Sequence, residues 1–310
     1  MANLLRHHGV SMSENMAFGL SGALSFAYLP FIRISGQPLI SYRMPPKAII
    51  KGMMKPLRAR FRFETFADAA AGERRLNELL DQGKLVGMQT SVFWLPYFPP
   101  DMRFHFNAHN LLVYGRDGGD YLVSDPVFEH PVRCAAPDLA RARFARGVLA
   151  PKGLLYYPQS VDCKEVRPEA LRQAIRTTAR RMLAPVPIVG VRGMRRLAAR
   201  LEKLPAAEPA SLEFIGHIVR MQEEIGTGGA GFRFLYAGFL QEAAHIMQLP
   251  QLMVFAERLT AIGDDWRRLA LAAARMVKGR DAPDPPALAR RLRAQADAEA
   301  SFFRELRAAV

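Results

Sequence analysis

The stretch AHNLLVYGRDGGDYLVSDP, residues 108–126, has the pattern of a β-hairpin. Its first apolar run covers Asn110 to Tyr114, and a second one covers Tyr121 to Ser124. The Asp-Gly-Gly sequence at 117–119 favours a tight turn between them, because glycine reaches positive φ angles without a steric penalty. We therefore predict two antiparallel strands here, which places a sheet in the first half of the chain.

On both sides of this hairpin, short strand patterns alternate with helical patterns. We expect strands near residues 26–28, 31–34, 61–64, 85–90 and 153–157, and helices over residues 1–8, 45–54, 67–82 and 137–146. Pro30 and Pro38 are expected to break the first strand region. From residue 165 onward the pattern is helical, over 168–183, 190–203, 208–225, 231–247, 250–278 and 286–308. The predicted fold class is α+β, with a mixed or antiparallel sheet domain at residues 1–160 and an all-α domain at residues 161–310.

The composition is that of a folded protein with a basic surface. Hydrophobic residues make up 50% of the 310 residues and charged residues 23%, which excludes extensive disorder. The net charge of +14 favours a polyanionic or acidic partner, such as nucleic acid, a membrane surface, a phosphate-bearing ligand or an acidic protein. An arginine-rich composition without any such partner is an alternative of equal weight.

The cysteines and the apolar runs indicate the compartment. Cys134 and Cys163 are too few for a disulfide framework, which favours a reducing environment. No run reaches about 18 apolar residues, and the first residues lack the apolar core of a signal peptide. We therefore expect a cytoplasmic protein without a transmembrane segment. No His or Cys cluster has the spacing of metal ligands, so no metal site is predicted.

The hairpin also brings two chemically useful residues together. His109 starts the outgoing strand, and Asp125 follows the returning one. A carboxylate beside an imidazole fixes the tautomer and leaves the other ring nitrogen as a base, which is the arrangement of a nucleophilic triad. On spacing alone, a histidine at a strand end and an Asp-Pro turn is the more common interpretation. The aromatic loop ahead of the hairpin, with Trp94 and Tyr97, either lines a substrate groove or fills the core.

Two features of the helical half suggest anion binding. The segment EEIGTGGAGFR at 223–233 precedes a helix, so the bare amides of Gly226, Gly228 and Gly229, with Arg233, could bind a phosphate. A helix-ending glycine followed by a loop is the equally weighted alternative. The stretch 167–203 is rich in arginine, and Arg192, Arg195 and Arg196 could dock an acidic protein. Few aromatic residues interleave with these charges, which argues against nucleic acid, and a merely solvated face is the more common interpretation. The apolar C-terminal helices also allow a homodimer.

Several motifs together resemble a known family. The stretches HHGVSMSENMAFGL (7–20), LPYFP (95–99), AHNLLVYG (108–115) and VSDP (123–126) resemble the N-terminal domain of the butirosin-biosynthesis protein H family. EEIGTGGAGFRFLYAGFLQEAA (223–244), with Trp266 further on, is similar to the uncharacterised helical domain that commonly follows it. The resemblance covers nearly the whole chain, and its motifs are specific in combination rather than singly.

The resemblance implies a papain-like fold and an acyltransferase. Such an enzyme moves an aminoacyl group from the phosphopantetheine thioester of an acidic acyl carrier protein to a small amine acceptor in secondary metabolism. His109 and Asp125 match the family's catalytic His and Asp, and we assign Glu14, with Trp94 and Tyr97, to substrate binding. The basic helical half would hold the carrier protein, and the glycine segment would receive the phosphate of its arm. No cofactor bound permanently is expected.

One element of the family's pattern falls outside the sequence. The family's cysteine lies just ahead of the segment that corresponds to ANLLRHHG, whereas this sequence begins at Met1, inside that helix. Neither Cys134 nor Cys163 matches its position, so we expect the reading frame to extend upstream. Two alternatives stay open: a papain-like hydrolase of amide or peptide bonds, and a non-catalytic binding or scaffold protein on a degenerate papain-like fold.

Overall fold

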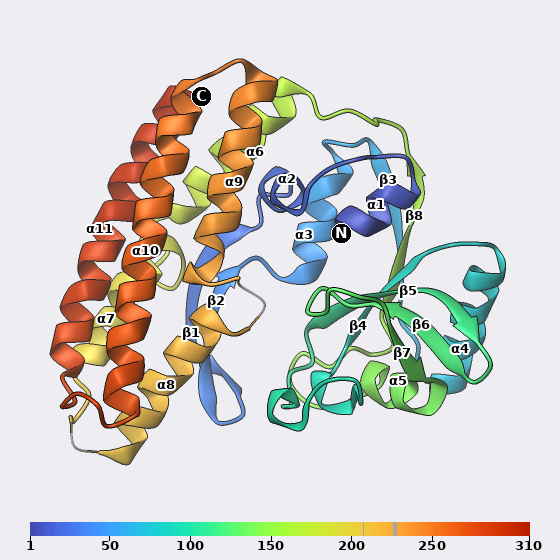
Figure 1. Ribbon diagram of the computed structural model, residues 1–310, viewed down its shortest axis with the longest axis horizontal. Helices are drawn as coiled ribbons and strands as arrows, with labels where there is room; N and C mark the ends of the chain where they lie inside the picture. The colour runs from blue at the N-terminus through green and yellow to red at the C-terminus, as the bar shows by residue number, and fades with distance from the viewer. Residues whose placement is uncertain (207, 226–227) are drawn as a thin grey trace. The chain divides into compact units, whose positions relative to one another are not determined.

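The structure, a computed structural model, describes residues 1–206, 208–225 and 228–310 (Figure 1). The chain divides into two compact units. The sheet unit comprises Met1–Met12 and Leu57–Glu165, and the helical unit comprises Ser13–Pro56 and Val166–Val310. These units differ from a single division at residue 160, because the segment 13–56 belongs with the C-terminal helices rather than with the sheet.

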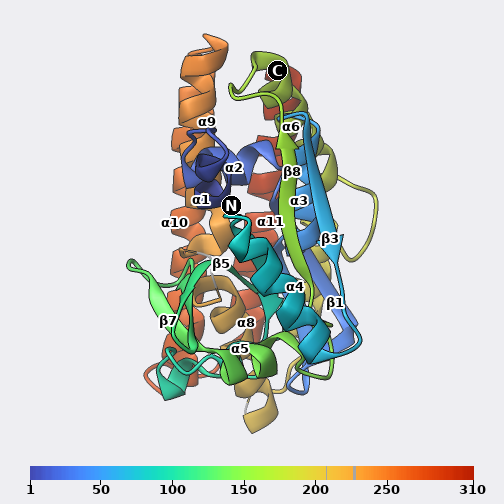
Figure 2. The ribbon, with the colours of Figure 1, turned by 90° about the vertical axis from the view of Figure 1, so that its right-hand side faces the viewer.

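The sheet unit is built on a six-stranded antiparallel sheet, in the order β3-β8-β4-β5-β6-β7 over the described residues. The strands are β3 (Ala59–Glu64), β4 (Val86–Thr90), β5 (His109–Asp117), β6 (Asp120–Ser124), β7 (Val132–Ala135) and β8 (Leu155–Val161). Figure 2 shows β3 and β8 running side by side. Asp117 pairs with Asp120 across the turn, which confirms the predicted hairpin. Among these six strands, β7 was not predicted from the sequence; its four residues pair with β6.

Helices cover one face of this sheet. They are α4 (Ala69–Asp81) and α5 (Ala136–Arg143); the unit also contains α1 (Ala2–His7) and the short 3₁₀ turns η1 (Val92–Trp94) and η2 (Pro100–Met102). Asp68 caps α4 by accepting hydrogen bonds from the backbone N–H groups of its first turn. Apolar side chains of α4, α5 and the strands form one buried cluster, which includes Leu79, Leu139 and Val113. The hydrophobic effect therefore fixes the sheet against these helices.

The helical unit contains most of the predicted helices. Its elements are α2 (Glu14–Leu20), β1 (Leu24–Ile34), β2 (Gln37–Arg43), α3 (Pro46–Met54), α6 (Pro168–Met182), α7 (Gly190–Glu202), α8 (Pro209–Glu223), η3 (Ala230–Phe232), α9 (Arg233–Met247), α10 (Gln251–Val277) and α11 (Pro285–Ala309). Proline occupies the first turn of α6, α8 and α11, where its missing N–H costs nothing. Across the described residues, no helix combines the length and the apolar character needed to cross a membrane.

The strands β1 and β2 form a hairpin that packs on these helices. The prediction that Pro30 breaks the strand was wrong, because an irregular register between Leu29 and Arg33 accommodates the proline within β1. Pro38 likewise lies within β2. Phe26, Tyr42 and Trp266 form a cluster of aromatic rings with centroids 5.3 to 6.3 Å apart. This contact with α10 is why the hairpin joins the helical unit.

Candidate functional site

His109 and Asp125 meet at one edge of the sheet in the sheet unit. His109 opens β5, opposite Thr90 at the end of β4, and Asp125 directly follows β6. The imidazole Nε2 lies 2.6 Å from the carboxylate Oδ2. The Asp125 side chain is fully buried, whereas 11% of the His109 side chain is exposed. The proximity predicted from the hairpin is therefore confirmed, and solvent can reach only the histidine.

The carboxylate of Asp125 is held by further donors. The backbone N–H of Val127 donates to Oδ1 at 3.0 Å, in a local turn two residues on. The hydroxyl of Tyr97 donates to Oδ2 at 2.8 Å. Burial and the negative charge of Asp125 raise the pKa of Tyr97 far above its usual value, so the phenol stays a donor. Tyr97 thus orients the carboxylate, a role that its place in an aromatic loop did not suggest.

The other side of the His109 ring is left for chemistry. A carboxylate only accepts hydrogen bonds, so Nε2 carries the proton toward Asp125 and Nδ1 has the lone pair. No hydrogen bond to Nδ1 occurs among the residues that the structure describes. The edge of Phe98 packs on the ring, with centroids 5.5 Å apart. The imidazole is therefore fixed in orientation and tautomer while one nitrogen remains a base.

The first turn of α1 lies at the same edge of the sheet. The amide of Asn3 donates to the hydroxyl of Ser124 at 3.4 Å. Ser124 directly precedes Asp125, so this contact places the start of α1 beside the histidine–carboxylate pair. The start of a helix carries partial positive charge, which favours an anion such as a thiolate.

Neither cysteine of the chain has the environment of a nucleophile. Cys134 is buried in the core of the sheet unit, and burial together with Asp138 and Asp120 raises the pKa of its thiol to about 12. Cys163 donates to the carbonyl of Glu165 at 3.1 Å. Among the described residues, neither thiol hydrogen-bonds His109. The sulfur chemistry of a papain-like site would have to come from another thiol.

The remaining predicted substrate residues, Trp94 and Glu14, belong to different units. Trp94 ends η1 with 39% of its surface exposed, and the guanidinium of Arg141 lies over its ring at 5.9 Å. Its neighbour Phe93 stacks on His105 with centroids 4.0 Å apart. Glu14 is the exposed first residue of α2 in the helical unit. Trp94 therefore shares a unit with His109, and Glu14 does not.

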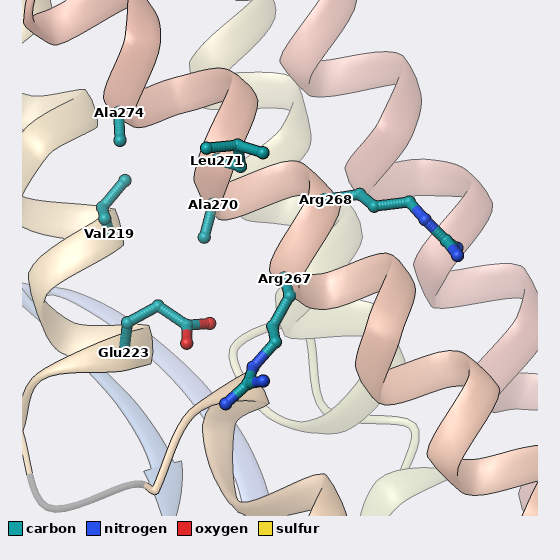
Figure 3. A pocket seen from close by; sticks show the side chains of 7 residues that line it. All are labelled: Val219, Glu223, Arg267, Arg268, Ala270, Leu271 and Ala274. Atoms are coloured by element: carbon teal, nitrogen blue, oxygen red, sulfur yellow. The ribbon is translucent and has the colours of Figure 1, made fainter.

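The glycine-rich segment differs from the predicted phosphate site. Gly226 lies outside the described residues. Gly228 and Gly229 form a turn with positive φ angles, and the next amide, that of Ala230, donates to the carboxylate of Glu223 at 3.1 Å. Figure 3 shows Glu223 and Arg267 at one end of an open groove of about 390 Å³ between α8 and α10, whose other lining residues are Val219, Arg268, Ala270, Leu271 and Ala274. The amide that follows the two predicted glycines is therefore bonded to a carboxylate of the chain itself.

Arg233 has a structural partner instead of a phosphate. Its side chain is fully buried, and Nε and Nη2 each donate to the carboxylate of Glu299 at 2.9 Å. Nη1 donates to the carbonyl of Gly231 at 2.7 Å. The indole of Trp266 donates to the same carboxylate at 2.6 Å. The sequence pattern could have suggested the burial of Glu299, though not its partner, because Glu299 falls on the apolar face of α11 with Leu292, Ala296 and Phe303.

The three arginines of the predicted docking face are exposed on α7. Arg195 pairs with Asp297 at 2.6 Å, and Arg192 donates to the carbonyl of Pro185 at 3.3 Å. Arg196 has no ion pair within the described part of the chain. The docking prediction is not tested by these contacts, but they show that the three side chains differ in how many donors remain available.

Comparison with known protein families gives matches over most of the chain. The model described as "Butirosin biosynthesis protein H, N-terminal" matches residues 1–126, a range that includes both His109 and Asp125. The model described as "Domain of unknown function (DUF4872)" matches residues 137–306. No curated protein matches the chain. The resemblance predicted from the motifs is confirmed: the chain belongs to the DUF4872 family and carries a butirosin biosynthesis protein H N-terminal domain ahead of that domain.

Proposed function

We propose that this protein acts in biosynthesis related to that of butirosin, as an acyltransferase with a papain-like sheet unit. The observation that supports the proposal is the His109–Asp125 pair, whose carboxylate is buried, held by two further donors and bonded to Nε2. An imidazole fixed in this way presents Nδ1 as a base of defined direction. Structural histidines rarely need a carboxylate that is itself so fully oriented.

In the proposed reaction, His109 moves one proton in each half. Nδ1 accepts the proton of a cysteine thiol, and the thiolate attacks the carbonyl carbon of a thioester on an acyl carrier protein. The phosphopantetheine thiolate leaves and takes that proton from His109, so an acyl-enzyme thioester remains. An amine then attacks this thioester, Nδ1 accepts the amine proton and returns it to the leaving cysteine, and an amide is released. Asp125 stabilises the imidazolium formed in both halves.

The nucleophile would stand immediately ahead of α1. The family resemblance puts the cysteine there, and the hydrogen bond from Asn3 to Ser124 places the start of that helix beside the histidine–carboxylate pair. Both the helix dipole and the adjacent imidazole would lower the pKa of a thiol at this point. The same helix therefore supplies position and electrostatics.

The proposed partners are assigned to exposed side chains of each unit. Trp94, exposed on η1 at the His109 end of β4, is proposed to contact the acyl or amine substrate, and Glu14 to attract the ammonium form of the amine acceptor. The acidic carrier protein is proposed to dock on α7 at Arg192, Arg195 and Arg196. Of these three, Arg196 should contribute most, since Arg195 already pairs with Asp297. Exchange of Arg196 for glutamate should weaken carrier binding more than exchange of Arg195, and equal affinities at low salt would contradict this docking.

The direct test uses protein translated from a start upstream of Met1. It is treated with an acyl thioester, and the intact mass is measured. Acylation of an upstream cysteine that is lost in His109→Ala is the expected result. Cys163→Ser is the matched control, because it removes the partly exposed thiol without touching the site. Acylation that is indifferent to His109, or no acylation at all, would contradict the proposal.

The placement of the two internal cysteines favours a second candidate, a binding or scaffold protein on the same fold. Neither Cys134 nor Cys163 is bonded to His109 among the described residues. The same labelling experiment separates the candidates, because a scaffold forms no acyl-enzyme but still binds the carrier protein. A papain-like hydrolase would form the acyl-enzyme and release an acid rather than an amide, so product analysis identifies it.

A further inference from the structure

A carboxylate and a guanidinium face each other at one end of the groove between α8 and α10. Figure 3 shows the side chains of Glu223, from α8, and Arg267, from α10, pointing toward one another there. In the part of the chain that the structure describes, no ion pair joins these two side chains. Glu223 is partly exposed and Arg267 is exposed, so a molecule arriving from solvent can reach both.

The carboxylate of Glu223 is anchored by one oxygen and leaves the other available. Oε1 accepts from the backbone N–H of Ala230 at 3.1 Å and from the side-chain amide of Gln222 at 2.7 Å. Among the described residues, no hydrogen bond reaches Oε2, which can therefore accept a donor from a ligand. Glu223 is also the last residue of α8, where the helix dipole adds partial negative charge. Both features favour a cation such as an ammonium group at this point.

The guanidinium of Arg267 is held in place by an aromatic ring. It lies over the ring of Phe234, from α9, at 4.9 Å. Stacking uses the face of the guanidinium and leaves the N–H donors at its edge available. The next residue, Arg268, pairs with Asp265, and Figure 3 shows its side chain turned away from Glu223. Over residues 1–206, 208–225 and 228–310, no carboxylate forms an ion pair with Arg267, so its donors can bind an anion.

A glycine lets the two charged groups come close to the same point of the backbone. A Cβ at Gly229 would lie 2.7 Å from Nη2 of Arg267 and 3.0 Å from Oε2 of Glu223, which is too close for nonbonded atoms. The φ angle of Gly229 is 88°, in the region that favours glycine. Any other residue at this position would therefore push the carboxylate or the guanidinium away.

The rest of the groove is apolar. It is lined by Val219 of α8 and by Ala270, Leu271 and Ala274 of α10. Leu271 is 63% exposed, so a ligand that covered it would gain from burial of apolar surface. The volume of about 390 Å³ lies near the lower end of the roughly 300–1,000 Å³ of ligand pockets. These dimensions suit a small molecule with opposite charges at one end and an apolar group at the other.

We propose that this groove binds a free α-amino acid with an apolar side chain. The ammonium group of the amino acid donates to Oε2 of Glu223, its carboxylate accepts from Arg267, and its side chain covers Leu271. A ligand with a single charge would leave either Glu223 or Arg267 without a partner. The site lies wholly within the helical unit and is independent of the His109–Asp125 pair and of acyl transfer.

The test measures binding of L-leucine to the full chain by isothermal titration calorimetry. Glu223→Gln and Arg267→Gln should each weaken binding on the order of tenfold, since a hydrogen bond between charged groups is lost. Glu223→Gln keeps an oxygen that accepts from Ala230, so the glycine turn should be preserved. Glu257→Gln on α10 and Arg291→Gln on α11 remove exposed charges outside the groove, and these matched controls should leave the affinity unchanged.

Three analogues of leucine test each part of the ligand on the unaltered protein. Leucine amide lacks the carboxylate, N-acetyl-leucine lacks the ammonium group, and glycine lacks the apolar side chain. Each should bind more weakly than L-leucine, on the order of tenfold or more.

The proposal is overturned if L-leucine shows no saturable binding, or if any of the three analogues binds as well as L-leucine does. It is also overturned if the two control variants weaken binding as much as Glu223→Gln and Arg267→Gln. Circular dichroism of each variant checks that the helices remain folded, and the analogue series does not depend on any variant.

Discussion

Each unit contains a buried, hydrogen-bonded pair of ionisable side chains, and the two pairs differ in how many of their hydrogen-bonding groups have partners within the chain. In the helical unit, Arg233 and Glu299 are both fully buried, and every nitrogen of the guanidinium has an acceptor. In the sheet unit, Asp125 is buried, but His109 reaches solvent and keeps Nδ1 without a partner among the described residues. A pair whose donors are all bonded within the chain stabilises the fold, whereas a pair that leaves one hydrogen-bonding group unbonded can act on a substrate.

The difference also shows that a sequence motif does not by itself establish the function of its residues. The glycine-rich segment with Arg233 resembles an anion site in sequence, yet an internal carboxylate satisfies its arginine. The His109 and Asp125 motif is less specific by spacing, yet its geometry is that of a base and its orienter. The number of donors and acceptors left after folding decides between the two.

The largest effect is expected at the buried pair. Arg233→Met should lower the free energy of unfolding by about 3–5 kcal/mol, because Glu299 would be left as a buried, uncompensated charge. The additional change Glu299→Leu should recover much of that loss, since no buried charge would remain. Urea denaturation measures both. Arg195→Met, at the exposed pair with Asp297, should cost less than about 1 kcal/mol. If Arg233→Met lowered the free energy of unfolding by as little as Arg195→Met does, a structural role for Arg233 would be contradicted.

A change at the second pair should affect rate more than stability. Asp125→Asn keeps the shape but cannot hold the same histidine tautomer, so the rate of acyl transfer should fall on the order of 10³-fold. The free energy of unfolding should change by only about 1–2 kcal/mol, because the amide oxygen still accepts from Val127 or Tyr97. Single-turnover acylation and urea denaturation on the same protein separate the two quantities. A large loss of stability with an unchanged rate would make this pair structural, like the other.

The role of Tyr97 gives a finer test of the same comparison. Tyr97→Phe removes one charge-assisted hydrogen bond to Asp125 and little packing, so we expect about 2 kcal/mol of interaction free energy to be lost. If Tyr97 orients the carboxylate, that loss should appear mainly in the acylation rate, with substrate affinity unchanged. If it lines a substrate groove, as the sequence suggested, affinity should fall instead. Comparing the change in kcat with the change in KM distinguishes these two roles of Tyr97.

The smallest effect is expected at Ser91, directly after β4. Its hydroxyl is fully buried and has no hydrogen-bond partner among the residues that the structure describes. Ser91→Ala should therefore leave the free energy of unfolding unchanged or raise it by less than about 1 kcal/mol, because an unsatisfied polar group is removed. Thermal unfolding measures this. A clear loss of stability would mean that a bound water or a substrate group satisfies the hydroxyl.

Local features of the fold were predictable from the sequence. The prolines and the helical period located the C-terminal helices, and the Asp-Gly-Gly turn located the β5–β6 hairpin. The turn also brought His109 and Asp125 together, because the residues are only 16 positions apart and one hairpin connects them. The error at Pro30 arose because the irregular register of β1 depends on its partner strand.

Longer-range pairings were decided only by the tertiary structure. The segment 13–56 joins the helices because Phe26 and Tyr42 pack on Trp266, more than 200 residues away in the chain. Glu299 reaches Arg233 across 66 positions, and no period in the sequence encodes that distance. The sequence by itself determined which segments are helix or hairpin and which residues share a turn, since those depend on neighbours. Only the packing within each unit decided which charged groups are bonded inside the chain and which stay available to a ligand, because burial depends on residues far apart in the sequence.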